Sequence, residues 1–129
     1  TYLYVYSFST MLYRNEGKRF SAVTLPYQAQ LSPVYDLIIK DFNKDNRKDI
    51  LMAGNFSHSE TETGEMDAGN GTLLLQQADG SFVFVPNRIH GFWAQKEVRE
   101  LNLIRLGNGR EAILTGNNRG PIELTMMIN

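Results

Sequence analysis

Residues 35–54 read YDLIIKDFNKDNRKDILMAG, in which a polar loop separates two short apolar segments. Side chains that carry oxygen recur along this loop at Asp41, Asn43, Asp45 and Asp49. Calcium prefers about six to eight oxygen ligands, and alternate residues of a tightly wound loop can turn several side chains inward. We therefore predict a calcium site between two β-strands, with these four side chains and the backbone carbonyl of Arg47 as ligands.

Two other interpretations of this loop are open. An EF-hand loop needs glycine at its sixth position and glutamate at its twelfth, whereas this chain has Asn46 and Met52 there. The flanking apolar segments also lack helical spacing, so an EF-hand is disfavoured. A solvated turn is the other alternative, because Asp, Asn and Lys are common at hairpin tips without any metal. Asn46 tolerates a positive φ angle, so it can replace the usual glycine.

The overall composition indicates one globular domain. The chain has 129 residues, of which 42% are hydrophobic and 21% are charged. Its net charge of -1, without a run of like charges, does not indicate nucleic acid or an anionic membrane as a partner. No apolar stretch approaches the roughly 20 residues of a membrane span, and the absence of cysteine excludes disulfide bonds.

The predicted calcium site also bears on location. Free calcium is scarce in the cytosol, and a weak single-loop site has a dissociation constant on the order of 0.1 to 1 mM. Such a site fills only outside the cytosol. The sequence therefore predicts an exported protein of the cell surface, the periplasm or the extracellular space.

Several landmarks recur along the chain at a spacing of about 62 residues. The matched pairs are Leu12 and Leu74, Phe20 and Phe82, and Gly54 and Gly116. Residues 50–55 likewise match residues 112–117. A repeat of this length that is built from strands indicates propeller blades or a β-solenoid.

Short apolar segments separated by Asn, Asp and Gly turns predict an all-β chain. The expected strands are residues 33–41, 49–55, 71–78 and 81–86, followed by 98–106, 111–117 and 121–128. Before them, outer strands of a preceding unit are expected at residues 2–8, 10–15 and 20–25. Asp79-Gly80 and Asn108-Gly109 predict tight type I′ hairpins, in which both central residues need positive φ.

The loop and its flanking strands resemble the FG-GAP/VCBS repeat family, whose blades carry an Asp-x-Asp/Asn-x-Asp-Gly-x-x-Asp-Leu calcium loop. The residues that match this pattern in order are Asp41, Asn43, Asp45, Asp49 and Ile50. Later segments look like uncharacterised exported VCBS repeat proteins of Bacteroidetes, namely Gly71-Thr-Leu-Leu-Leu, Asp79-Gly-Ser-Phe and Val98-Arg-Glu-Leu. Asn46 stands where the family usually has glycine, and the Phe-Gly…Gly-Ala-Pro segment is absent, so integrin-type ligand binding is not implied.

The resemblance implies an all-β fold of about two four-stranded antiparallel β-propeller-type blades. Residues 1–27 would be outer strands of a preceding blade, 28–87 a complete blade with the calcium loop, and 88–129 a following blade without its last strand. The second copy of the loop, 107–111, lacks the ligand set, so one calcium is expected. Propellers usually need about four to eight blades, so we expect a fragment. Missing blades, or homo-oligomerisation through exposed strand edges, would complete it.

Groups for catalysis are sparse in this sequence. Only His58 and His90 can serve as histidine partners of a nucleophile, and no Gly-x-Ser-x-Gly elbow is present. Hydrolase chemistry is therefore poorly supported.

Three residues outside the loop are candidates for ligand binding. His58 begins a polar loop that continues through Glu60, Glu62, Glu65 and Asp67; a metal site there is an alternative to the favoured solvated connection. Asp67 is a candidate for a second cation and for hydrogen bonds to nearby amides. Trp93 can stack on a sugar ring or a partner side chain, although packing between blades is favoured.

Together these features predict a non-catalytic, calcium-binding propeller segment of an exported or cell-surface protein. It would serve as a scaffold for a protein or glycan ligand, with calcium rigidifying the blade. The alternative is an accessory or partial catalytic domain of a polysaccharide-degrading enzyme. Because one fold hosts many functions, the fold does not choose between them.

Overall fold

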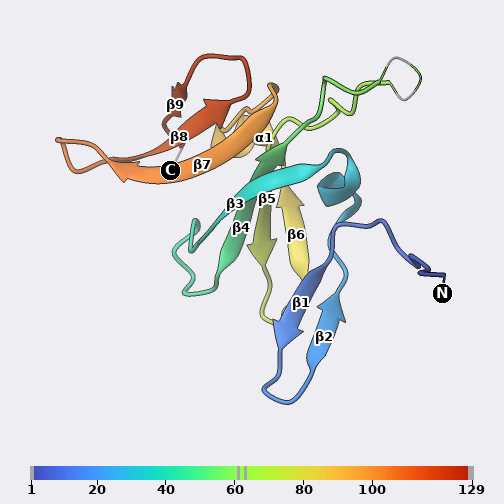
Figure 1. Ribbon diagram of the computed structural model, residues 1–129. Coiled ribbons are helices and arrows are strands. Elements are labelled where there is room, and N and C mark those ends of the chain that lie inside the picture. Colours follow the sequence, from blue (N-terminus) through green and yellow to red (C-terminus); the bar gives the residue numbers. More distant parts are fainter. Residues whose placement is uncertain (1, 61, 63, 128–129) are drawn as a thin grey trace.

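The structure is a computed structural model that describes residues 2–60, 62 and 64–127. Its strands form three antiparallel sheets, shown in Figure 1. The protein is therefore all-β, as the sequence predicts. Within the described residues, no helix is long and apolar enough to cross a membrane.

The first sheet pairs β1 (Leu12–Asn15) with β2 (Phe20–Val23). The four-stranded sheet has the order β3 (Val34–Lys40), β4 (Asp49–Gly54), β5 (Thr72–Gln76) and β6 (Phe82–Val85). The three-stranded sheet has the order β7 (Val98–Arg105), β8 (Glu111–Asn117) and β9 (Glu123–Thr125). A single 3-10 turn, η1 (Tyr27–Gln30), follows β2, and a short helix, α1 (Asn87–His90), follows β6.

Most of the expected strands lie within about two residues of their observed bounds, which is the usual uncertainty of strand ends. The expectation for residues 2–8 is wrong, because no strand forms there and Tyr2, Leu3 and Tyr6 are almost fully exposed. An alternating segment forms a strand only where a partner strand pairs with it, and none does so here. The last strand is also shorter than expected, although residue 128 lies outside the described part of the chain.

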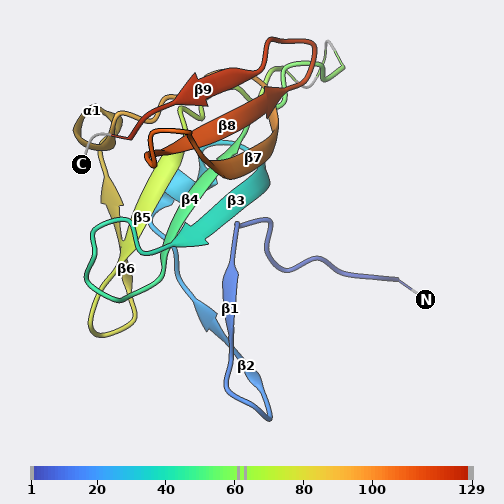
Figure 2. The same ribbon diagram turned by 90° about the vertical axis from the view of Figure 1, so that its left-hand side faces the viewer.

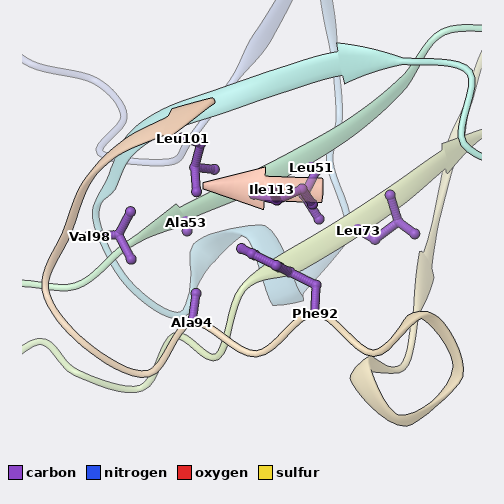
Figure 3. Close-up of a cluster of buried hydrophobic side chains, with 8 residues drawn as sticks. All are labelled: Leu51, Ala53, Leu73, Phe92, Ala94, Val98, Leu101 and Ile113. Carbon is purple, nitrogen blue, oxygen red and sulfur yellow. The ribbon is translucent and has the colours of Figure 1, made fainter. Parts of the chain in front are cut away.

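Hydrophobic residues pack on both faces of the four-stranded sheet. One face packs against the three-stranded sheet through Leu51, Ala53, Leu73, Phe92, Ala94, Val98, Leu101 and Ile113, the cluster drawn in Figure 3. On the opposite face, Ile50, Met52, Leu74 and Phe82 pack with Leu25 and Ala29, and the β1–β2 hairpin adds Leu12 and Val23. Strand β4 is therefore buried at every residue, which explains its continuous apolar sequence.

The three-stranded sheet repeats the pairing pattern of the four-stranded sheet. Strand β3 contains a bulge between Val34 and Asp36 where it pairs with β4, and β7 contains one between Val98 and Glu100 where it pairs with β8. These two bulged strands lie side by side at the junction of the sheets, as Figures 1 and 2 show.

The strand registers correct one detail of the sequence match. In the four-stranded sheet Ile39 pairs with Ile50, and in the three-stranded sheet Leu103 pairs with Ile113. Counted from the two bulges, Ile113 is therefore the counterpart of Ile50, whereas the sequence match had assigned Ala112. A shift of one residue turns every side chain of a strand to the opposite face, so this difference decides which residues enter the core.

The two predicted type I′ hairpins are wrong in detail. The Gly80 N–H donates to the Gln77 carbonyl at 2.9 Å, and of the two central residues only Gly80 has a positive φ, 82°. The Gly109 N–H donates in the same way to the Leu106 carbonyl at 2.9 Å. Both are turns followed by a glycine bulge, because Asp79 and Asn108 keep negative φ and leave the left-handed position to glycine alone.

Candidate functional site

The loop between β3 and β4 winds around the carboxylate of Asp41. Its Oδ1 accepts the Asp45 N–H at 3.0 Å, and its Oδ2 accepts the Asn46 N–H at 2.8 Å. Asn46 is left-handed, with a φ of 67°, as expected from its place in the sequence, and Lys44 has a φ of 64°. The backbone is thus folded into a compact turn with the first predicted ligand at its centre.

Asp45 is the most heavily bonded side chain of this loop. It accepts the Arg47 N–H at 2.9 Å, the Asn43 amide at 2.6 Å and the Arg47 guanidinium at 2.5 Å. Burial raises the pKa of Asp45, but the Arg47 N–H, the Asn43 amide and the charge of Arg47 together lower this pKa below its ordinary value. The carboxylate therefore stays ionised, and a guanidinium is its present counter-charge.

Asp49 anchors the loop to the sheet. It is fully buried, and it accepts the Phe42 N–H at 2.8 Å and the Gln76 N–H at 3.0 Å. The Arg47 Nε donates to the Gln76 carbonyl at 2.8 Å, which adds a second link to β5. The sequence predicts Asp49 as a ligand, but it does not predict that Asp49 holds two backbone amides.

The residue types in this loop suit a calcium ion, but the observed arrangement of their side chains suits it less well. Asp41, Asn43 and Asp45 offer oxygen atoms of the kind that calcium prefers, within a turn of the expected shape. Within the described residues, however, no three Asp, Glu, His or Cys side chains are grouped so that they could hold a metal. Arg47 would compete with the ion for the Asp45 carboxylate. Asp49 keeps free lone pairs, since each carboxylate oxygen can accept more than one bond.

His58 lies in a cluster that the sequence did not reveal. Its Nδ1 is 2.8 Å from Oε2 of Glu97, a buried residue that also bonds to Asn118 and Arg99. Burial raises the pKa of Glu97, but the bonds from His58 and Asn118 and the charge of Arg99 outweigh it and lower this pKa. The cluster ties the loop after β4 to the three-stranded sheet, so His58 does not join the acidic residues that follow it. The one sequence feature that indicates this cluster is a pair of opposite charges two residues apart, Glu97 and Arg99.

The other two candidates lie on the surface. Asp67 is exposed, and within the described part of the chain its carboxylate makes no hydrogen bond, so the expected bonds to nearby amides are absent. Trp93 is 51% exposed, and the favoured packing between sheets is wrong for it, because its neighbour Phe92 is fully buried instead. Phe92 lies beside Gly71, where an added Cβ would be 2.6 Å from its ring.

A cavity of about 660 Å³ opens between the two larger sheets, beside the loop. Apolar side chains from both sheets line it, including Leu75, Val85, Leu103 and Ile113, and its rim carries charged residues, including Lys44, Arg105 and Glu111. His90, on α1, also borders the cavity; its Nδ1 accepts the Phe92 N–H at 3.2 Å, and among the described residues its buried Nε2 makes no hydrogen bond of normal geometry. This volume is in the range of small-molecule pockets.

No protein-family model matches this chain, and neither a curated protein nor a solved structure gives a significant match.

Proposed function

We propose that this protein is a non-catalytic, calcium-binding β-propeller segment of the FG-GAP/VCBS type, acting as an interaction scaffold. The observation that carries the proposal is the path of the loop from Asp41 to Asp49. A left-handed Asn46, bonded through its N–H to Asp41, gives the turn that a glycine would give at this position.

The arrangement of the sheets supports the blade assignment. Propeller blades are four-stranded antiparallel sheets arranged around a common axis. The four-stranded sheet has this strand order, with its two faces packed against different neighbours, and the three-stranded sheet repeats its bulge and register. A propeller usually needs about four to eight such units, so further blades from the same or another chain would complete it.

Calcium would have a structural role in this proposal. The ligands would be Asp41, Asn43, Asp45 and Asp49, together with the Arg47 carbonyl. The ion would neutralise the carboxylates of the loop and tie the end of β3 to the start of β4. A site of this weak class fills outside the cytosol, which is why we propose an exported or cell-surface location.

The ligand of the scaffold would be a protein or a glycan. Loops held by a rigid sheet are the usual position of binding residues. The half-exposed Trp93 supports such a role, because an exposed indole can stack on a sugar ring or on an apolar side chain of a partner.

Calorimetric titration of chelator-stripped protein with calcium tests this proposal. The expected result is one site, with a melting temperature that rises in calcium. Asp45→Ala should abolish both effects, whereas Asp79→Ala, which removes an exposed carboxylate from the β5–β6 hairpin, should leave both unchanged. Retained binding in Asp45→Ala, or no binding by the wild type, would exclude calcium from the loop.

A further inference from the structure

Where the two larger sheets meet, one face of the four-stranded sheet packs against one face of the three-stranded sheet, and these two faces carry different residues. On the β3 side, Ile38 and Leu51 point toward the three-stranded sheet; on the β7 side, Leu101 and Ile113 point back. Two polar contacts join the same strands: the Leu101 N–H donates to Oδ2 of Asp36 at 2.7 Å, and the Arg99 guanidinium lies 3.7 Å from the centre of the Tyr35 ring. The junction is therefore specific as well as apolar.

Each of these faces has a counterpart elsewhere in the molecule. Counted from the bulges, Leu37 and Ile39 of β3 are the counterparts of Leu101 and Leu103 of β7. They lie on the face of the four-stranded sheet that points away from β7, because their cross-strand partners Met52 and Ile50 belong to the opposite core. On that face of the four-stranded sheet, Leu37 and Ile39 therefore occupy the strand positions that Leu101 and Leu103 occupy at the junction.

Leu37 and Ile39 are not covered. Leu37 is 45% exposed and Ile39 58%, whereas Leu101 at the equivalent position is 5% exposed. On this face Leu12 and Val23 of the β1–β2 hairpin pack with Leu25, Ala29 and the core residues of β4 and β5, together with Val34 at the start of β3, but Leu37 and Ile39 are not part of this cluster. An apolar strip on the first strand of the sheet is thus open to solvent.

The three-stranded sheet has the complementary open face. Glu100 is the counterpart of Asp36, Leu114 of Leu51 and Leu124 of Leu73, and all three side chains lie on the face that points away from the four-stranded sheet. Leu124 is 52% exposed, Leu114 is partly exposed, and Glu100 is exposed. This face repeats two of the apolar residues and the carboxylate that the four-stranded sheet offers at the junction, while Asn102 stands at the position of Ile38.

We propose that copies of this chain associate head to tail, with the outer face of the three-stranded sheet packed on the open β3 face of the next copy. The apolar contact would join Leu114 and Leu124 to Leu37 and Ile39. Glu100 would take the place of Asp36 and accept the Leu37 N–H, which now bonds to Oδ1 of Asp36 within its own strand. This inference rests on the blade assignment of the proposed function, but not on calcium.

The occupant is a second copy because the two open faces carry, at most equivalent positions, the same kinds of residues as the two faces that already fit each other, with Asn102 in place of Ile38 as the exception. The contact joins unlike surfaces, so each copy keeps one free face, and association continues until a ring closes. The proposed contact is formed by the faces of the sheets, whereas the sequence predicts association through exposed strand edges.

Sedimentation equilibrium over a range of protein concentrations tests this arrangement. The wild type should assemble, while Leu37→Arg and Leu124→Arg should each weaken association by about tenfold or more, because each places a charge in the contact. An equimolar mixture of the two variants should form a one-to-one dimer, since each still carries the face that the other has lost. Val83→Arg, on an equally exposed strand residue of β6 outside both faces, should assemble like the wild type.

The mixing experiment separates a head-to-tail contact from any symmetric one. A wild type that stays monomeric, single variants that assemble like the wild type, or a mixture that stays monomeric would each overturn the proposal. Circular dichroism of every variant checks that it is folded. Repeating the series in chelator keeps this result independent of calcium binding, so either proposal can fail while the other stands.

Discussion

The four-stranded and three-stranded sheets share their order, register and bulge, but they differ in how they are covered. Strand β4 is buried along its whole length, whereas its counterpart β8 alternates between buried and partly exposed residues toward its end. The sequences of the two strands are similarly apolar. Burial of these two strands therefore depends on whether a second layer covers each face, and not on the apolar content of the strand.

The loop between β3 and β4 and the loop between β7 and β8 differ in length and in their hydrogen bonds. The first is long and acidic, and Asp49, the β4 residue that follows it, is buried and accepts two backbone N–H groups. The second closes directly through the Gly109 hairpin, and Ala112 occupies the position of Asp49 in the register. A long loop needs internal hydrogen-bond partners for its backbone, and a short hairpin does not.

The largest expected effect contrasts Leu101 with Leu37. Leu101→Ala should lower the free energy of unfolding by about 3 kcal/mol, because it leaves a cavity at the junction of the sheets. Leu37→Ala should cost less than about 1 kcal/mol at concentrations where the protein is monomeric, since its side chain is already half exposed. Urea denaturation measures both, and equal losses would contradict the assignment of covered and open faces.

A second prediction contrasts the two loops. Asp49→Ala should cost about 2 kcal/mol or more, because the Phe42 and Gln76 amides lose their acceptor in a buried site. Asp79→Ala, in an exposed hairpin, should cost less than about 1 kcal/mol. Both values are measured in chelator, so that calcium does not contribute. A neutral Asp49→Ala would show that water replaces the carboxylate.

A third prediction concerns His90, the last residue of α1; the last residue of the other short helix, η1, is Gln30, which does not titrate. Burial lowers the pKa of His90 below its ordinary value of 6.5, and the Val85 carbonyl opposes this only in part. The unfolded chain therefore binds the proton more readily, so stability falls as the pH drops below about 6.5, by at most about 1.4 kcal/mol per pH unit.

Chemical denaturation between pH 7 and 5 measures this slope. The carboxylates whose pKa is lowered, such as Glu97, lose their contribution only below their ordinary pKa of 4.5, and so they do not account for it. His90→Gln, which can still accept the Phe92 N–H, should flatten the profile. If the dependence of stability on pH were unchanged in this variant, the proton taken up on unfolding would belong to another group.

The smallest expected effect concerns Arg47. Its guanidinium lies 2.5 Å from the Asp45 carboxylate, where it would compete with the calcium ion that we propose. Arg47→Ala should therefore tighten calcium binding by about threefold, since it removes a positive charge from a partly exposed site. Arg110→Ala, in the short loop, is the control and should not change the affinity. Weaker binding by Arg47→Ala would mean that the guanidinium helps to shape the loop.

Much of the local structure could be predicted from the sequence. The strands between residues 33 and 117 follow from apolar segments bounded by Asn, Asp and Gly, and the turn at Asn46 follows from its place in the loop. These features depend on residues that are close together along the chain. Residues 2–8 show the limit of such reasoning, because alternation without a partner strand gave no strand.

The surroundings of the candidate site could not be predicted. The bond between His58 and Glu97 joins residues far apart in the chain, and neither has a motif that points to the other. The sequence also did not show that Phe92, and not Trp93, would be buried. Both outcomes depend on how the segment after α1 crosses the four-stranded sheet, which is a long-range property.

Most strands, the places of their turns and the bend of the oxygen-rich loop at Asn46 follow from residues that are close together along the chain. Long-range packing, in contrast, buries Asp49 as an anchor and covers Leu101, while it leaves the counterpart Leu37 open. Alternation along a strand fixes which side chains share a face, but burial of that face depends on another sheet packing against it.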